Sequence, residues 1–260
     1  MKIPTVEYHI ALGDLHIPDV VNCDIKTKLE NGNIFNPSKD QKALWAEFKR
    51  IYRIHLDQIG NDDFYTIING DTLEGVHHKR NTLHTSHFAD QMKLAIPVIE
   101  YLKAPKNCCG IWIIRGTPCH DGEGGENIER LAMEVKALKI GERYSQPYLN
   151  LKLGDKIINY KHFTSNSENG LNKEYRAVMK ACYQDGTHID MSVRSHIHQF
   201  ARLHKGGWIG LVLPGWQLPT QYSINTIDGG LVKMEYGMTL ISCEKNKLEV
   251  NNLNEIFEMA

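Results

Sequence analysis

The segment Tyr8-His-Ile-Ala-Leu-Gly-Asp-Leu-His16 decides the fold prediction. Its first five residues form an apolar run with the length of a buried β-strand. The pair Asp14-x-His16 follows that run after a single glycine. In an extended chain, residues i and i+2 point the same way, so Asp14 and His16 can hold one ion together. We therefore predict a strand that ends in two metal ligands.

The same arrangement recurs along the chain, because further clusters of aspartate and histidine each close a short β-like stretch. These clusters are Gly70-Asp71, Gly116-Thr117 with His120 and Asp121, His162, and His196-x-His198. Their side chains are expected to converge at one edge of a sheet. Such a set is sufficient to hold two divalent metal ions and to hydrolyse a phosphate ester.

Strands and helices alternate in the first half of the chain, whereas the second half is mostly strands. The expected helices begin behind the N-cap residue Ser38 and span 84–102, with a kink or break at Pro97, 127–138 and 173–183. The expected strands span 64–68, 110–114, 190–194, 200–203, 208–213 and 232–243, with a hairpin over 149–160. This order predicts an α/β fold with two sheets face to face and helices outside.

Mixed ligation by histidine and aspartate suits Mn, Fe or Zn better than Ca or Mg. The two oxygens of a carboxylate such as Asp71 can bridge two ions. Two divalent cations bring four positive charges and the carboxylates of Asp14 and Asp71 bring two negative ones, which leaves about +2. That charge attracts a phosphate and acidifies a bridging water, so no covalent protein nucleophile is required.

Composition limits the class of protein without deciding it. The chain has 260 residues, enough for one larger α/β domain, and a net charge of −1, so it is not a polycation built for nucleic acid. We expect the thiols to be reduced and the protein to be cytoplasmic, or to act in the host cytoplasm if a phage encodes it. We also expect no secretory signal and no membrane-spanning segment. The cysteines, which lack zinc-ribbon spacing, are Cys23, Cys108, Cys109, Cys119, Cys182 and Cys243.

The ordered clusters resemble the calcineurin-like metallophosphoesterase superfamily. The pattern of that family is D-x-H, G-D, G-N-H-D/E, H and G-H-x-H. Segments that match it in the same order are Gly13-Asp-Leu-His16, Asn69-Gly-Asp71, Arg115-Gly-Thr-Pro-Cys-His-Asp121, Lys161-His162 and Ser195-His-Ile-His198. Each segment alone is a weak signal, but five in order, each just after an expected strand, are a strong one.

The resemblance implies a single domain over 1–260 with a four-layer αββα sandwich of two mixed sheets flanked by helices. One ion is expected on Asp14, His16, Asp71 and His198. The other is expected on Asp71, His162, His196 and Thr117. We expect Mn as the most favoured of the two divalent ions, with Fe, Zn or Ni as alternatives. A metal-bridging hydroxide would attack phosphorus, and His120 would protonate the leaving oxygen.

The third motif departs from the family pattern, because Gly116-Thr-Pro-Cys-His120 lacks the metal-binding asparagine. Thr117 stands in its place and ligates through a hydroxyl, which is a weaker ligand than an amide carbonyl. The alternative is that the loop brings His120 to the metal and leaves no general acid there. In the last motif, Ser195 replaces glycine, which is a minor change.

The substrate is expected to be a phosphodiester, such as a nucleotide or a nucleic-acid end. The basic run His77-His-Lys-Arg80 follows Asp71 closely, and His77, Lys79 and Arg80 are candidates for holding a substrate phosphate, although such runs are more often solvated faces. The alternatives are a phosphomonoesterase, or a catalytically weak metal-binding scaffold for protein assembly, a use to which some superfamily members put the fold. The sequence does not indicate the oligomeric state.

Three further features have competing interpretations. The spacing Cys109-x5-Arg115 matches cysteine-dependent phosphatases, but its intervening residues form an apolar strand, so we reject that class. Trp216 can stack a base, although core packing is the more common use. The segment 122–125, Gly-Glu-Gly-Gly, either presents backbone N–H groups to an anion or is only a flexible turn.

Overall fold

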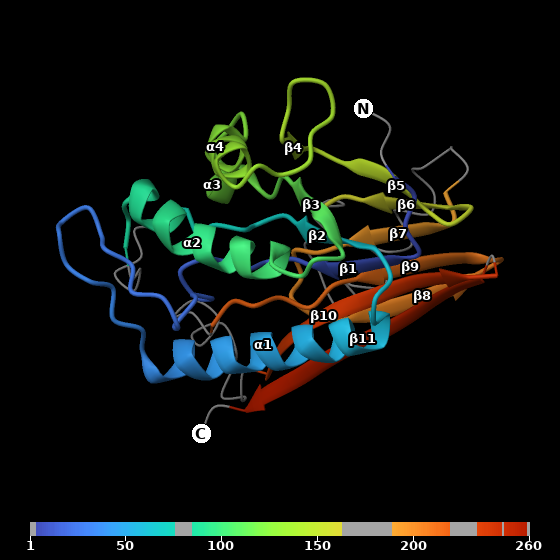
Figure 1. Ribbon diagram of the computed structural model, residues 1–260, viewed down its shortest axis with the longest axis horizontal. Coiled ribbons are helices and arrows are strands. Elements are labelled where there is room, and N and C mark those ends of the chain that lie inside the picture. The colour runs from blue at the N-terminus through green and yellow to red at the C-terminus, as the bar shows by residue number, and fades with distance from the viewer. Residues whose placement is uncertain (1–3, 76–84, 163–188, 219–232, 246, 259–260) are drawn as a thin grey trace, which may run out of the picture.

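Two β-sheets form the centre of the computed structural model, which describes residues 4–75, 85–162, 189–218, 233–245 and 247–258 (Figure 1). The first sheet has the strand order β11-β10-β1-β2-β3-β4. Strands β1 to β4 run parallel, and β10 pairs antiparallel with β1 and with β11. The bounds are β1 Tyr8–Leu12, β2 Phe64–Asn69, β3 Cys108–Ile114, β4 Ser145–Gln146, β10 Lys233–Glu244 and β11 Lys247–Glu258.

The second sheet has the order β5-β6-β7-β9-β8. Its central strands β6, β7 and β9 are parallel, while β5 and β8 are antiparallel edge strands. The bounds are β5 Leu149–Leu153, β6 Lys156–Tyr160, β7 Met191–Arg194, β8 Ala201–Lys205 and β9 Trp208–Val212. Both sheets are therefore mixed, as the sequence predicts.

The helices pack on the face of the first sheet that points away from the second sheet (Figure 1). Their bounds are α1 Lys39–Ile59, α2 Phe88–Lys103, α3 Pro118–Asp121 and α4 Glu126–Glu134. Within the described ranges, no helix combines the length and the apolar composition that crossing a bilayer requires. The helix expected over 173–183, which would belong to a fourth layer, lies outside the described residues.

Side-chain alternation in β1, β2 and β3 produces two cores, one on each face of the first sheet. In β2, for example, Phe64 and Ile68 pack under the helices, whereas Tyr65 and Ile67 pack between the sheets. Strands buried on both faces appear in the sequence as continuous apolar runs, which is why these three were predictable.

The predicted start of α1 is confirmed. Ser38 is its N-cap, and its hydroxyl accepts a hydrogen bond from the Gln41 amide at 3.1 Å. The Gln41 side chain in turn accepts from the Ser38 amide at 2.7 Å, which completes a capping box.

Several predicted boundaries are wrong. Helix α2 begins at Phe88 and not at 84, and it continues through Pro97 without a break. Helix α4 ends at Glu134, because Lys136 adopts φ 51° and the Leu138 amide bonds to β3 instead. The sequence also gave no signal for α3, β4 or β11.

The loops that carry the aspartate and histidine clusters meet at the carboxyl ends of β1, β2, β3, β6 and β7. Backbone hydrogen bonds extend the pairing of β1 with β2 beyond the strand ends: the Asp14 amide donates to Gly70, and the His16 amide donates to Asp71, both at 3.0 Å. Between β6 and β7, the Ser195 amide donates to the His162 carbonyl at 3.0 Å. The predicted convergence of these side chains is therefore confirmed, but the loops come from the adjoining edges of both sheets and not from one sheet.

Candidate metal centre

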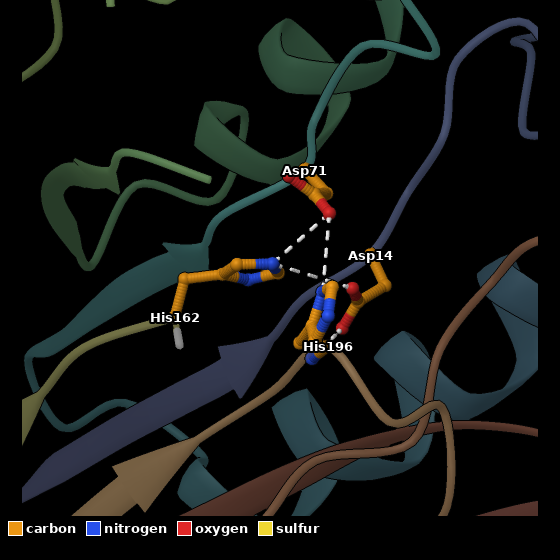
Figure 2. A group of neighbouring side chains, drawn as sticks. All are labelled: Asp14, Asp71, His162 and His196. Atoms are coloured by element: carbon orange, nitrogen blue, oxygen red, sulfur yellow. Dashed lines mark hydrogen bonds and ion pairs between the residues drawn. The ribbon is translucent and has the colours of Figure 1, made fainter. Parts of the chain in front are cut away.

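Two carboxylates and two histidines from four different loops point toward one another (Figure 2). His162 Nε2 lies 3.0 Å from an oxygen of Asp71 and 3.8 Å from an oxygen of Asp14. His196 Nδ1 lies 3.8 Å from the same Asp71 oxygen. One candidate ligand atom from each of these four residues lies within 4.8 Å of all the others, which is close enough to surround one cation.

A second group shares Asp14 and adds His16 and His198. His198 Nε2 lies 3.2 Å from the Asp14 oxygen and 3.2 Å from His16 Nε2. His16 Nε2 is 3.9 Å from that oxygen. The six aspartate and histidine side chains expected as metal ligands are thus brought together in two adjoining groups.

The buried histidines of the centre are oriented in the same way. His162 Nδ1 bonds to the Asn69 carbonyl at 2.8 Å, and His16 Nδ1 bonds to the Glu74 carboxylate at 2.8 Å. In both rings the Nδ1 position faces an acceptor, and Nε2 faces the carboxylates. This is the orientation that metal-binding histidines usually have, because the acceptor fixes the tautomer and the ring plane.

Burial and the neighbouring charges shift the pKa values of the central histidine and carboxylate in opposite directions. Burial by itself would lower the pKa of His162, but Asp71 and Asp14 raise it to about 10. Burial also disfavours ionised Asp71, yet His162 and His196 hold its pKa well below the usual value. The opposed charges of the histidine and the carboxylates thus favour the charged form of each group against the effect of burial.

Two buried atoms fit a bound cation. Asp14 Oδ1 and His162 Nε2 are shielded from solvent and make no well-aligned hydrogen bond in the described part of the chain, although His198 and Asp71 lie 3.2 and 3.0 Å from them. Buried polar atoms without a well-aligned hydrogen bond are costly, and here both face the centre of the cluster. Bound divalent ions would coordinate both atoms.

Thr117 lies against Asp71. Its backbone amide donates to Asp71 Oδ1 at 2.6 Å, and its hydroxyl donates to the same oxygen at 3.1 Å. These contacts bring the third motif to the centre. They also mean that Thr117 supports Asp71 directly, whatever ligand role its hydroxyl has.

His120 is also at the centre, with 6% of its surface exposed. Its Nδ1 lies 2.5 Å from the Glu74 carbonyl oxygen, and its Nε2 lies 3.7 Å from Asp71. It forms a third group with His16 and Asp71. This position is compatible with both roles predicted for His120, namely general acid and metal ligand.

The glycines of the second and third motifs are required by close contacts. A Cβ on Gly70, which has φ 88°, would lie 2.3 Å from the His162 ring. A Cβ on Gly116 would lie 2.0 Å from Asp71 Oδ1.

Asp121 lies next to this close contact and accepts a hydrogen bond from the Gly116 amide. Burial, and to a lesser extent repulsion from Asp71, raises the pKa of the Asp121 carboxyl to about 7.

A cavity of about 220 Å³ adjoins the centre. Arg115 and Lys161 line it together with the metal-centre residue His162. The segment 122–125 also lines it, but the amides of its three glycines bond to Pro118, Glu126 and Gly122. These glycine amides are therefore not available to an anion, which favours the turn interpretation of the segment.

Trp216 packs in the core, which is the use the sequence favours for it, and its ring is not exposed to stack a base. Its side chain is fully buried and packs against Phe48 and Tyr236, at ring separations of 4.8 and 6.0 Å. Its backbone amide donates to the Asp14 carbonyl at 2.8 Å, so Trp216 anchors the first motif to the core.

Sequence reasoning missed two residues near the centre, and three residues that it predicted lie outside the part of the chain that the structure describes. Glu74 contacts the ring of His16, and Gln217 donates to Glu74. The only sequence signal was an acidic residue three positions after Asp71. The predicted phosphate-binding residues His77, Lys79 and Arg80 lie outside the described residues. The structure supports the rejection of Cys109-x5-Arg115 as the loop of a cysteine-dependent phosphatase, because residues 109–114 belong to strand β3. The Arg115 side chain bonds instead to Ser145 and Gly124.

No family model and no curated protein matches the chain. Solved structures similar to it include a conserved uncharacterized protein and predicted phosphoesterase from Streptococcus pneumoniae, with 11% identity, TM-score 0.42 and coverage of 99% of this chain and 100% of that one. An archaeal phosphodiesterase has 11% identity, TM-score 0.45 and coverage of 95% and 99%. Vps29 from Entamoeba histolytica, complexed with zinc, has 10% identity, TM-score 0.39 and coverage of 95% and 98%. Likeness at this level assigns no activity to this chain.

Proposed function

We propose that the protein is a binuclear metal-dependent phosphoesterase of the calcineurin-like type. The observation that carries this proposal is the convergence of two carboxylates and four histidines in two adjoining groups, Asp14 with Asp71, His162 and His196, and Asp14 with His16 and His198. Within it, Asp14 Oδ1 and His162 Nε2 are buried without a well-aligned hydrogen bond, which bound cations would satisfy.

The proposed ligand sets are those that the motif resemblance implies: Asp14, His16, Asp71 and His198 hold one cation, and Asp71, His162, His196 and Thr117 hold the other. Asp71 is the proposed bridging carboxylate, because it lies in one group with His162 and His196 and in another with His16. Asp14 also lies between the sites, since the groups of His162 with His196 and of His16 with His198 share it. The imidazole and carboxylate donor set favours Mn, with Fe, Zn or Ni as alternatives.

Two bound cations would supply positive charge for the phosphate and activate a water molecule as the nucleophile. The protein residues provide the rest of the chemistry. His120 is the proposed general acid: its Nδ1 is held by the Glu74 carbonyl, so its Nε2 is the nitrogen that can deliver a proton to the leaving oxygen.

A phosphodiester is the proposed substrate class, with a nucleotide or nucleic-acid end as the favoured form. The cavity beside His162 has room for a group attached to the phosphate and carries the cationic side chains of Arg115 and Lys161. The basic run at 77–80 is the second proposed contact with the substrate. A monoester would leave this part of the site unused.

The second candidate function is a metal-binding scaffold with weak catalysis. Thr117 favours this candidate, since it occupies the position of the metal-binding asparagine and its hydroxyl donates to Asp71. A hydroxyl is the weaker ligand, and weaker binding of one cation would lower activity without disturbing the fold.

The test is hydrolysis of bis-p-nitrophenyl phosphate and p-nitrophenyl phosphate with added Mn, with Asp71→Asn as the matched variant. We expect faster hydrolysis of the diester, and loss of activity in the variant because the bridging charge is removed. A preference for the monoester would place the protein among the phosphatases. No hydrolysis of either ester by protein that binds Mn would support the scaffold.

A further inference from the structure

Glu74 is a buried acid beside the metal centre to which the proposed reaction gives no side-chain role. Only 4% of its surface is exposed. Its carboxylate accepts from His16 Nδ1 at 2.8 Å and from the Gln217 side chain at 3.1 Å. Glu74 belongs to none of the candidate ligand groups found among the described residues. Its carboxylate therefore acts on the centre through His16.

The backbone around Glu74 is fixed from two sides. The Glu74 amide donates to the Ile17 carbonyl at 2.9 Å, which ties the β2 loop to the loop of His16. On the other side, the Gln91 side chain of α2 both donates to and accepts from the backbone of Gly75 at 2.9 Å. The carboxylate thus has a defined position beside His16.

The same segment supports the third motif. Gly75 has φ 68°, and a Cβ there would lie 2.6 Å from the Cys119 carbonyl oxygen and 2.9 Å from His120 Cα. The carbonyl of Glu74 accepts the Nδ1 proton of His120. Residues 74 and 75 therefore hold two histidine rings, those of His16 and His120, which pack edge to face at a centroid separation of 4.6 Å.

A carboxylate on Nδ1 of a histidine has two effects on its other nitrogen. It fixes the tautomer so that Nε2 carries a lone pair, and it increases the basicity of that lone pair. In His16, that nitrogen lies 3.2 Å from His198 Nε2 and faces Asp14. The geometry of Glu74 is therefore suited to strengthening one ligand of one cation.

We propose that Glu74 is a positioning residue that orients His16 toward the first cation and, through its backbone carbonyl, holds the ring of His120. This proposal rests on the proposed function. Glu74 does not touch the substrate or the cations. Its contribution is to the affinity of the one ion that His16 binds, and not to the ion bound by His162 and His196.

The experiment compares Mn titrations of metal-free wild-type protein, Glu74→Gln and Asp90→Asn, with free Mn measured by electron paramagnetic resonance. Asp90 is the matched control, because it is a buried carboxylate of α2 that accepts from Glu30 and Thr85 but contacts no candidate ligand. We expect Glu74→Gln to weaken one of the two Mn ions by about 10- to 100-fold and to leave the other unchanged. Asp90→Asn should bind both ions as the wild type does, and saturating Mn should restore most of the turnover of Glu74→Gln.

Wild-type affinity for both ions in Glu74→Gln would overturn the proposal, and so would equal weakening in Glu74→Gln and Asp90→Asn. If Glu74→Gln does not fold, Glu74→Asp replaces it, because that variant keeps the charge but retracts the carboxylate by one methylene. Weakening of the same single ion would support the proposal, and unchanged affinity would overturn it. Wild-type protein that binds fewer than two ions would instead contradict the proposed function.

Discussion

Five of the seven residues proposed as metal ligands occupy a backbone conformation that most residues avoid. Asp14, His16, Asp71, His196 and His198 have φ values between 42 and 79°. Elsewhere in the described part of the chain, only Lys136 and Lys245 share this property among residues other than glycine. Each such position costs on the order of 1 kcal/mol and persists only where surrounding contacts impose it. This concentration of strain supports a functional role for the loops.

At the residue scale, the role of His120 is directly testable with His120→Ala. As the general acid, His120 should contribute 10²- to 10⁴-fold to turnover, roughly the value typical of such assistance. We expect turnover to fall while two metal ions remain bound, and to fall less for nitrophenyl esters, whose leaving groups need little protonation. Kinetics and elemental analysis of the same preparation provide the measurement. Loss of one ion would show that His120 is a ligand.

His9 gives a pH prediction away from the metal centre. Burial lowers the pKa of His9 to about 3, and its Nδ1 lies 2.9 Å from the Tyr160 hydroxyl. Because the folded pKa is below the unfolded value, only the unfolded state takes up a proton on His9 as the pH falls from 6.5 toward 3. The free energy of unfolding is therefore unaffected by His9 above pH 6.5 and falls by about 1.4 kcal/mol per pH unit below it. His9→Gln should reduce the slope of unfolding free energy between pH 4 and 6 by about that amount, measured in urea with a chelator present. Equal slopes in the two proteins would contradict this account.

At the scale of elements, the N-cap of α1 contributes to stability without contacting the site. Ser38→Ala removes the hydroxyl that accepts from Gln41 and should cost about 1 kcal/mol of unfolding free energy. Lys39→Ala, one residue further along, is the control and should have little effect. Thermal unfolding of both variants tests this prediction, and equal melting temperatures would contradict it. Mn affinity should be unchanged in both.

The segment 77–80 is the element that the proposed diester substrate would contact beyond the centre. A combined Lys79→Ala and Arg80→Ala change should raise KM for an oligonucleotide and flatten its salt dependence, because fewer phosphates are neutralised. The same variant should hydrolyse bis-p-nitrophenyl phosphate at the wild-type rate, since that ester has no further phosphates for the basic run to neutralise. Equal losses on both substrates would show that the run is structural.

At the scale of the whole molecule, the sequence predicted the parts whose signal is local. β1, β2 and β3 were predictable because they are buried on both faces. β11 was not, because its asparagines at 251, 252 and 254 have low strand propensity and the strand depends on its ladder with β10. The motif residues were predictable as a series, whereas Glu74 was missed because its contact with His16 spans 58 positions. Such a contact exists only once the β1 and β2 loops pair.

The measurement that tests the central claim most directly is the number of Mn ions bound by metal-free protein, with Asp71→Asn as the comparison. Two ions per chain are predicted for the wild type, together with a higher melting temperature when Mn is added. Asp71→Asn should weaken both ions, because Asp71 faces His162 and His196 of one proposed site and lies in a group with His16 of the other. Wild-type protein that binds no Mn and melts at the same temperature with and without it would contradict the account.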